Sequence, residues 1–172
     1  MTLQLRHETP ADIAAIEAVT VAAFADAPHT SHTERFIVRA LRAAHELTLS
    51  IVAEEHGEVV GHVAVSPMTI TDSHGRKGEG WYGLGPISVL PLRQGNGIGS
   101  RLMEQALSEL RAMRAAGCML LGDPAYYARF GFQAHAGLQL PGVPPGYFMA
   151  LALQGPVPEG IVQYSDAFNA AA

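Results

Sequence analysis

The sequence predicts a single α/β domain over residues 1–172, and three observations support this prediction. Short apolar segments that read as strands are interspersed with longer segments whose apolar residues recur at helical spacing. Apolar residues make up 48% of the chain and charged residues 16%, a balance typical of a compact folded protein. The chain contains no internal repeat, low-complexity tract or linker, so we expect a core over about residues 3–155 and a C-terminal extension over about 156–172.

The first half of the chain predicts strands around two helices. Alternating residues predict a strand over 3–6, and capping boxes at 9–12 and 31–34 predict two helix starts, the first helix ending near Phe24. Strands are expected over 47–54 and 59–70. The second helix is expected to turn its arginines to solvent, namely Arg35, Arg39 and Arg42. Its buried face is predicted to consist of Phe36, Ile37, Ala40, Leu41 and Ala44.

The second half begins with a polar hairpin connection over 72–80 and an interrupted strand over 81–90. A long helix is expected from Ile98 or Gly99 to about Ala115, with Met113 on its apolar stripe and Gly117 ending it. A strand over 118–121 and a short helix over 125–130 should follow. Two strands are predicted over 132–140 and 147–153, and the tail over 160–168 predicts a final strand.

The composition excludes several classes of partner and site. Lys and Arg number 11 against 16 Asp and Glu, a formal net charge of −5, so we expect no nucleic-acid partner. Cys118 is the only cysteine, which excludes an internal disulfide and predicts a small buried side chain. The histidines lack metal-ligand spacing, so no metal is expected. Without a signal peptide or a membrane-length apolar segment, we expect a cytoplasmic protein that does not bind membranes.

The segment from Gly83 to Ser100 carries the strongest functional signal. Gly83, Gly85 and Pro86 interrupt a strand, as happens at bulges and where a ligand approaches the backbone. Glycines at alternate positions from Gly95 to Gly99 leave backbone N–H groups uncovered at a helix N-terminus, where an anion is favoured. The segment therefore predicts a site for a long ligand with a phosphate end and an extended arm.

Three sequence blocks resemble the GNAT-type acyl-CoA N-acyltransferases, and they follow one another along the chain as they do in that family. Gln94 to Gly99 fits the family's Q/R-x-x-G-x-G/A signature, Tyr126 to Phe132 is similar to its F-Y-x-x-x-G-F block, and the N-terminal strand and helix fit as well. The segments at 83–86 and 121–127 look most like the bacterial YhbS-type predicted acetyltransferases. The resemblance implies a mixed, mostly antiparallel sheet of about six to seven strands, opened at Ile87–Val89 and flanked by about four helices.

The resemblance also implies acetyl-CoA as co-substrate. Its pantetheine arm would run beside Ile87, Ser88 and Val89, with Tyr126 lining the cofactor. Its diphosphate would lie over the backbone of Gln94, Gly95, Asn96, Gly97, Ile98, Gly99 and Ser100. Asp123 stands in a region where many family members carry an asparagine, so a contact by that residue is not carried over.

The implied reaction is direct attack of a primary amine, on a small molecule or a protein, on the thioester. Tyr127 matches the family's general acid, and a backbone N–H near Ser88 or Val89 would bind the oxyanion. The base is open between Glu79, His62, Glu54 and a water relay. His29 and His32 lie in a loop that borders the acceptor pocket in this superfamily.

Two further expectations concern assembly and catalysis. The late strands and tail over 147–168 favour a homodimer in which they pair across subunits. The alternative function is a catalytically inactive acyl-CoA-binding sensor or assembly module, which would bind the cofactor without transferring the acetyl group.

Overall fold

The computed structural model describes residues 2–27 and 30–172, and the chain divides into two compact units. Unit 1 comprises Met1–Ser66, Gly85–Ala106 and Asp166–Ala172, and unit 2 comprises Pro67–Leu84 and Leu107–Ser165. Strands β3 (Glu58–Thr71) and β5 (Trp81–Val89) and helix α3 (Ile98–Ala112) each contribute residues to both units. The expectation of a single domain stays a prediction.

The mixed, mostly antiparallel sheet that was predicted is confirmed. Within the described residues it has nine strands, and six of them follow the order β1-β2-β3-β5-β6-β8. The ladders β5–β6 and β7–β9 are parallel, whereas β1–β2, β2–β3, β3–β4, β3–β9 and β6–β8 are antiparallel. The remaining bounds are β1 Gln4–His7, β2 Leu49–Glu55, β4 Lys77–Gly78, β6 Gly117–Leu121, β7 Leu138–Gln139, β8 Phe148–Ala152 and β9 Gly160–Tyr164.

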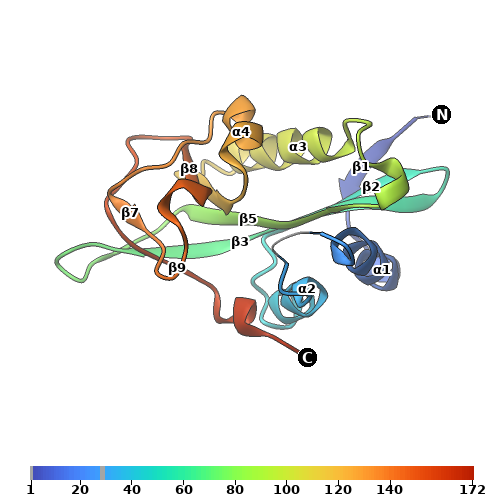
Figure 1. Cartoon of the computed structure of the whole chain (residues 1–172), viewed down its shortest axis with the longest axis horizontal. Coiled ribbons are helices and arrows are strands. Elements are labelled where there is room, and N and C mark those ends of the chain that lie inside the picture. The colour runs from blue at the N-terminus through green and yellow to red at the C-terminus, as the bar shows by residue number, and fades with distance from the viewer. Residues whose placement is uncertain (1, 28–29) are drawn as a thin grey trace. The chain divides into compact units, whose positions relative to one another are not determined.

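In unit 1, helices cover both faces of the sheet (Figure 1). Helices α1 (Ile13–Phe24) and α2 (Glu34–Ala43) lie on one face, where Ile16 and Val38 pack with the strand residues Val52 and Ala64. The start of α3 lies on the other face. A Cβ on Gly61 would stand 3.1 Å from both Ile98 and Leu102, so this glycine allows close contact between strand and helix.

In unit 2, an apolar cluster forms around Trp81, which is 4% exposed. A Cβ on Gly117 would lie 2.3 Å from the Trp81 ring, so Gly117 is required by packing at the start of β6. The predicted role of Gly117 in ending α3 is therefore wrong. Arg114 adopts the left-handed conformation after that helix instead, with φ 60°. Cys118 is fully buried as expected, and burial raises the pKa of its thiol to about 12.

Three local predictions are corrected. The strand expected over 132–140 is reduced to β7 and a single bridge between Gln133 and Ala150, because the rest of that segment forms turns. Ala44 and Met113 are exposed, since both lie just beyond the last turn of their helices. The late strands invoked for a homodimer pair within the chain, β8 with β6 and β9 with β3 and β7, and the homodimer stays a prediction.

Candidate active site

The glycine-rich turn forms an open cradle at the N-terminus of α3. Gly95 and Gly97 have φ values of +81° and +80°, and a Cβ on either would meet no heavy atom within 4 Å. Arg101 N–H donates to Gly97 O at 3.1 Å, so Gly97 is the last residue before the helix and Ile98 and Gly99 form its first turn. N–H groups of a first turn have no carbonyl partner within the helix, and they attract anions.

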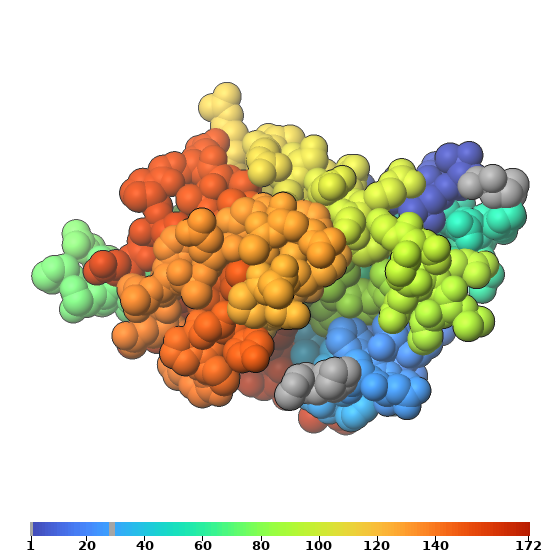
Figure 2. All heavy atoms as spheres, turned by 45° about the horizontal axis from the view of Figure 1, so that its top comes forward, coloured from blue at the N-terminus to red at the C-terminus, as the bar shows by residue number. Residues whose placement is uncertain are grey.

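Hydrogen bonds from two side chains to backbone carbonyl groups hold this turn in place. Gln94 Nε2 donates to Val89 O at 3.1 Å, and Asn96 Nδ2 donates to Arg93 O at 3.1 Å. Gln94, Gly95, Asn96 and Gly97 are exposed. Figure 2 shows yellow-green atoms of this part of the chain at the molecular surface. The side chains thus brace the loop while its backbone faces solvent, as an anion cradle requires.

Strand β5 leads into the cradle beside β3. Leu90 N–H donates to Val60 O at 2.9 Å, while further back Gly83 faces the Met68 side chain, so the two strands run antiparallel. Counting two residues from that hydrogen bond along each strand places Ser88 opposite His62. Ser88 O also lies 3.2 Å from the position of a Cβ on Gly61, which agrees with this register.

The edge of β5 opposite to β3 pairs with β6 over a short stretch. Trp81–Gly83 are in register with Gly117–Met119, and β6 ends at Leu121. This register therefore has no residue of β6 for Pro86–Val89. Ser88 is 1% exposed within that stretch, and its Oγ has no hydrogen-bond partner in the part of the chain that the structure describes.

His62 is the buried titratable group next to this strand. Its ring is fully buried and its Nε2 lies 2.8 Å from Ser50 Oγ. Its Nδ1 has no hydrogen-bond partner within residues 2–27 and 30–172. Burial lowers the pKa of His62 to about 4, an effect that the Glu8 charge opposes and the Arg42 charge reinforces, so the imidazole is neutral at pH 7.

Ser50 connects His62 to an ion pair. Its hydroxyl forms a very short hydrogen bond with Glu8 Oε1, and the Glu8 carboxylate receives two hydrogen bonds from Arg42, of 2.8 and 3.0 Å. Burial would raise the pKa of Glu8, but the hydrogen bonds from Arg42 and Ser50 outweigh it and lower that pKa. The prediction that Arg42 faces solvent is thus wrong, because its side chain forms an ion pair with Glu8.

Tyr127 lies in α4 (Pro124–Tyr127) in unit 2 and is partly buried. Its ring packs edge-on against Tyr126 at 4.9 Å and against Phe132 at 6.4 Å, and it fills the space that a side chain on Gly122 would need. Burial, with smaller contributions from Tyr126 and Asp123, raises the pKa of Tyr127, so its phenol keeps its proton at neutral pH.

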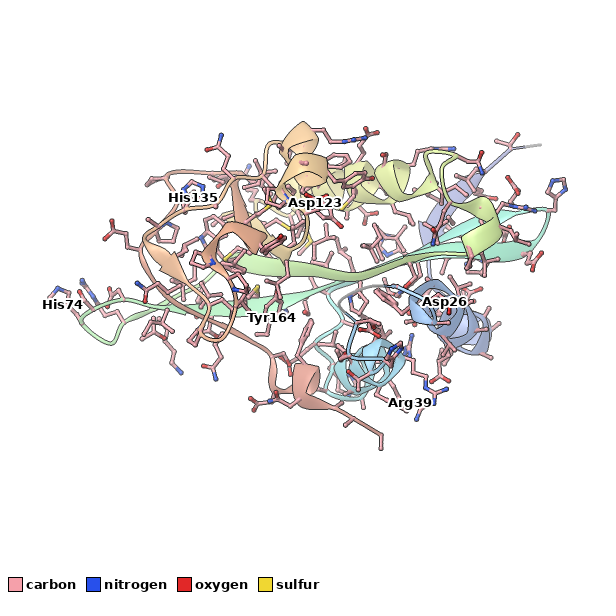
Figure 3. The ribbon with its side chains drawn as sticks, viewed as in Figure 1. Asp26, Arg39, His74, Asp123, His135 and Tyr164 are labelled. Carbon is pink, nitrogen blue, oxygen red and sulfur yellow. The ribbon has the colours of Figure 1, made fainter. Side chains whose placement is uncertain are left out.

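Asp123 has a structural role at the start of α4, where Figure 3 labels it. Its carboxylate accepts a hydrogen bond from Ala125 N–H at 3.0 Å and so caps the helix. Tyr126 packs beneath the guanidinium of Arg129, 4.4 Å from the ring centroid.

The other candidate bases differ sharply in their surroundings. Glu54 binds Arg6 at 2.8 Å, so its carboxylate is already used in an ion pair. Glu79 is exposed and lines a cavity of about 330 Å³ in unit 2 together with Arg76 and Lys77. His32 lines a smaller cavity of about 170 Å³ between α1 and α2, whereas His29 lies outside the described residues.

The comparison with family models identifies the chain. Residues 46–134 match the model described as an acetyltransferase (GNAT) domain. The chain belongs to the GNAT acetyltransferase family. The uncharacterized N-acetyltransferase YhbS of Escherichia coli K12 is 34% identical over 176 residues, covering 96% of this chain and 98% of YhbS. The predicted family, fold and acyltransferase class are thereby confirmed.

Two solved structures support the same assignment. A GNAT family acetyltransferase from Brucella melitensis in complex with acetyl-CoA is 48% identical, has a TM-score of 0.85, and covers 97% of this chain and 98% of its own. YhbS from E. coli in complex with CoA is 32% identical with a TM-score of 0.84, covering 97% and 92% of the two chains. Both fold like this GNAT protein over nearly the whole chain.

Two kinds of feature are absent from the described residues. Within them, no group of three or more His, Cys, Asp or Glu side chains is arranged to hold a metal ion. No helix among the same residues has the length and apolar character needed to span a membrane.

Sequence reasoning missed Glu8, Ser50 and Arg42 as partners of His62. They stand at positions 8, 50 and 42; the β1–β2–β3 pairing brings Glu8 and Ser50 to His62, and Arg42 reaches Glu8 from helix α2. One signal was available: a serine and a histidine stand among the apolar residues of two consecutive predicted strands, on faces that the structure buries. A polar residue on such a face needs a partner.

Proposed function

We propose that this GNAT protein transfers the acetyl group of acetyl-CoA to a primary amine, on a small molecule or a protein, by direct attack of the amine on the thioester. The observation that carries the proposal is the open cradle at Gly95–Gly99, which continues a strand whose buried Ser88 hydroxyl has no partner among the described residues. The acetyl-CoA and CoA complexes of two proteins with this fold add support.

The cradle fits the diphosphate of the cofactor. The backbone from Gln94 to Ser100, of which Gln94–Gly97 are exposed, would hold it with N–H groups and the helix dipole, which requires few cations in a chain with net charge −5. The stretch Ile87–Val89 would accept the amide-bearing pantetheine arm as a strand accepts a peptide. Tyr126 would line the cofactor.

The chemistry requires a base, an oxyanion donor and an acid. His62 is the base that the surroundings favour, because it is neutral and its Nδ1 has no partner in the described chain, whereas Glu54 is bound to Arg6 and Glu79 is exposed. A backbone N–H near Ser88 or Val89 would bind the oxyanion. Tyr127 would protonate the departing thiolate, and its raised pKa keeps the required proton in place.

Titration calorimetry with acetyl-CoA tests the binding half of the proposal. Gly97→Glu should weaken binding about 100-fold or more, because it sets a carboxylate where the diphosphate would lie. Gly75→Glu is the matched control: its φ of +77° gives similar backbone strain, and it lies in the turn after β3. Equal affinity in both variants and the wild type would show that the diphosphate binds elsewhere.

Acetyl transfer to a panel of amines tests the chemical half. We expect consumption of acetyl-CoA to be matched by N-acetylated product detected by mass spectrometry. Tight binding without turnover across small amines, peptides with free N-termini and peptides with lysine would favour the acyl-CoA-binding module instead. Absence of binding would contradict both functions.

A further inference from the structure

The hydrogen-bond chain behind His62 determines where its proton sits. Glu8 has a lowered pKa, so its carboxylate is ionised at pH 7 and accepts hydrogen bonds without donating any. The Ser50 hydroxyl has one proton, and its short contact with Glu8 Oε1 requires that proton. Ser50 Oγ must then accept from His62 Nε2 at 2.8 Å, which places the imidazole proton on Nε2.

It follows that Nδ1 carries a lone pair. No donor from residues 2–27 or 30–172 reaches it, although the ring is fully buried. A buried acceptor without a donor is costly and calls for an explanation. The residue opposite His62 on β5 is Ser88, whose buried hydroxyl is also without a partner in the described chain. Two unsatisfied polar atoms thus stand on adjacent strands where the proposed acyl site begins.

We propose that Glu8 and Ser50 are positioning residues that hold His62 as the Nε2–H tautomer, so that its Nδ1 receives the proton of the acceptor amine. This inference rests on the proposed function. The ammonium N–H bond breaks, its proton goes to Nδ1, and the electron pair left on nitrogen attacks the thioester carbonyl carbon. The Glu8 carboxylate, acting through Ser50, offsets part of the cost that burial imposes on the imidazolium, and the ring returns the proton to water after the transfer.

Arg42 completes the arrangement at the surface. Its two hydrogen bonds fix both oxygens of Glu8, and the side chains of Glu8 and Arg42 are only 18% and 22% exposed. The pair lines a cavity of about 340 Å³ with His7, His45 and Thr48. A guanidinium that binds both carboxylate oxygens keeps Glu8 ionised and oriented toward Ser50.

Nitrogen-15 NMR of the histidine rings tests the tautomer directly in the wild-type protein. We expect His62 to show a protonated Nε2 and an unprotonated Nδ1 at pH 7. Ser50→Ala removes the acceptor for Nε2–H, and Glu8→Gln allows the residue at position 8 to donate, so either should yield a mixture of tautomers. Ser50→Thr keeps the hydroxyl and should retain the single tautomer.

Kinetics provide the second readout. In Ser50→Ala and Glu8→Gln we expect kcat to fall about 10- to 100-fold while KM for acetyl-CoA changes less than about two-fold, because the base is disturbed and the cradle is not. Glu17→Gln is the matched control, since Glu17 also binds an arginine, Arg39, at 2.8 Å but on the solvent side of the helices. It should leave kcat and the tautomer unchanged.

The outcomes separate the two proposals. A wild-type spectrum with the proton on Nδ1, or variants that keep both the tautomer and kcat, would overturn this inference while leaving acetyl transfer intact. An Nε2–H tautomer in a protein that acetylates no amine would contradict the proposed function and the proton transfer, whereas the positioning of His62 by Glu8 and Ser50 would stand. If Ser50→Ala fails to fold, Glu8→Gln and the wild-type spectrum still decide the matter.

Discussion

The Arg6–Asp12 ion pair should make a large, pH-dependent contribution to stability. Arg6 donates to Asp12 Oδ2 and Oδ1 at 2.7 and 3.0 Å, and Thr9 adds its N–H at 2.7 Å. Removing one partner of a buried pair costs about 3–5 kcal/mol, and of an exposed pair about 0–1. The Asp12 side chain is 9% exposed and that of Arg6 is 29%, so we expect Asp12→Asn to lower the free energy of unfolding by about 2–3 kcal/mol.

Calorimetric melting as a function of pH is the assay. A loss of that size should lower Tm by about 4–12 °C at pH 7, at roughly 2–4 °C per kcal/mol for a chain of this length. Hydrogen bonds from Arg6, then from Thr9, lower the pKa of Asp12 in the folded state. Its stabilisation is therefore complete above the unfolded pKa of about 3.9 and is lost as the pH falls toward the folded value.

The difference between wild type and Asp12→Asn should accordingly be constant from about pH 5 to 7 and smaller at about pH 3. Glu17→Gln is the control, since its partner Arg39 is 53% exposed and the loss should stay below about 1 kcal/mol. A difference under 1 kcal/mol at pH 7, or one of the same size at pH 3 as at pH 7, would refute the reasoning.

The remaining predictions concern catalysis, packing and thiol access. Tyr127→Phe keeps the ring contacts and removes the phenol, so kcat should fall about 100-fold with acetyl-CoA affinity unchanged by calorimetry; an unchanged kcat would exclude it as the acid. Gly61→Val places methyl groups against Ile98 and Leu102 and should lower the free energy of unfolding in urea by about 1–3 kcal/mol, whereas wild-type stability would contradict this packing. Cys118 should react with iodoacetamide only on unfolding, given its complete burial and a pKa raised to about 12; rapid labelling of native protein would contradict that burial.

Most of the fold could be predicted because its signals are local. Capping residues, glycine turns and hydrophobic periodicity gave the bounds of α1, α2 and β3 to within a few residues. The failures arose where the outcome depends on distant residues. Gly117 stands where a glycine that ends a helix is expected, yet a glycine required for close packing against Trp81 gives the same sequence signal.

The candidate site shows the same difference between local signals and contacts with distant residues. The cradle at Gly95–Gly99 could be predicted, because backbone N–H groups at a helix start follow from the local sequence. The partners of His62 could not, because Glu8 and Arg42 are 34 residues apart and a solvent-facing arginine is the usual outcome for a polar helix position. Only the tertiary pairing of β1, β2 and β3 shows that the buried histidine is linked to a carboxylate.

The central claim is that the glycine-rich turn binds the diphosphate of acetyl-CoA. Amide NMR during titration with acetyl-CoA tests it most directly, because each backbone N–H reports its own hydrogen bond. We predict that the largest shift changes fall on Gly95, Gly97, Ile98 and Gly99, and that Gly75 and Gly142 in other exposed turns stay unchanged. Saturable binding that leaves the amides of the cradle unshifted would contradict the account.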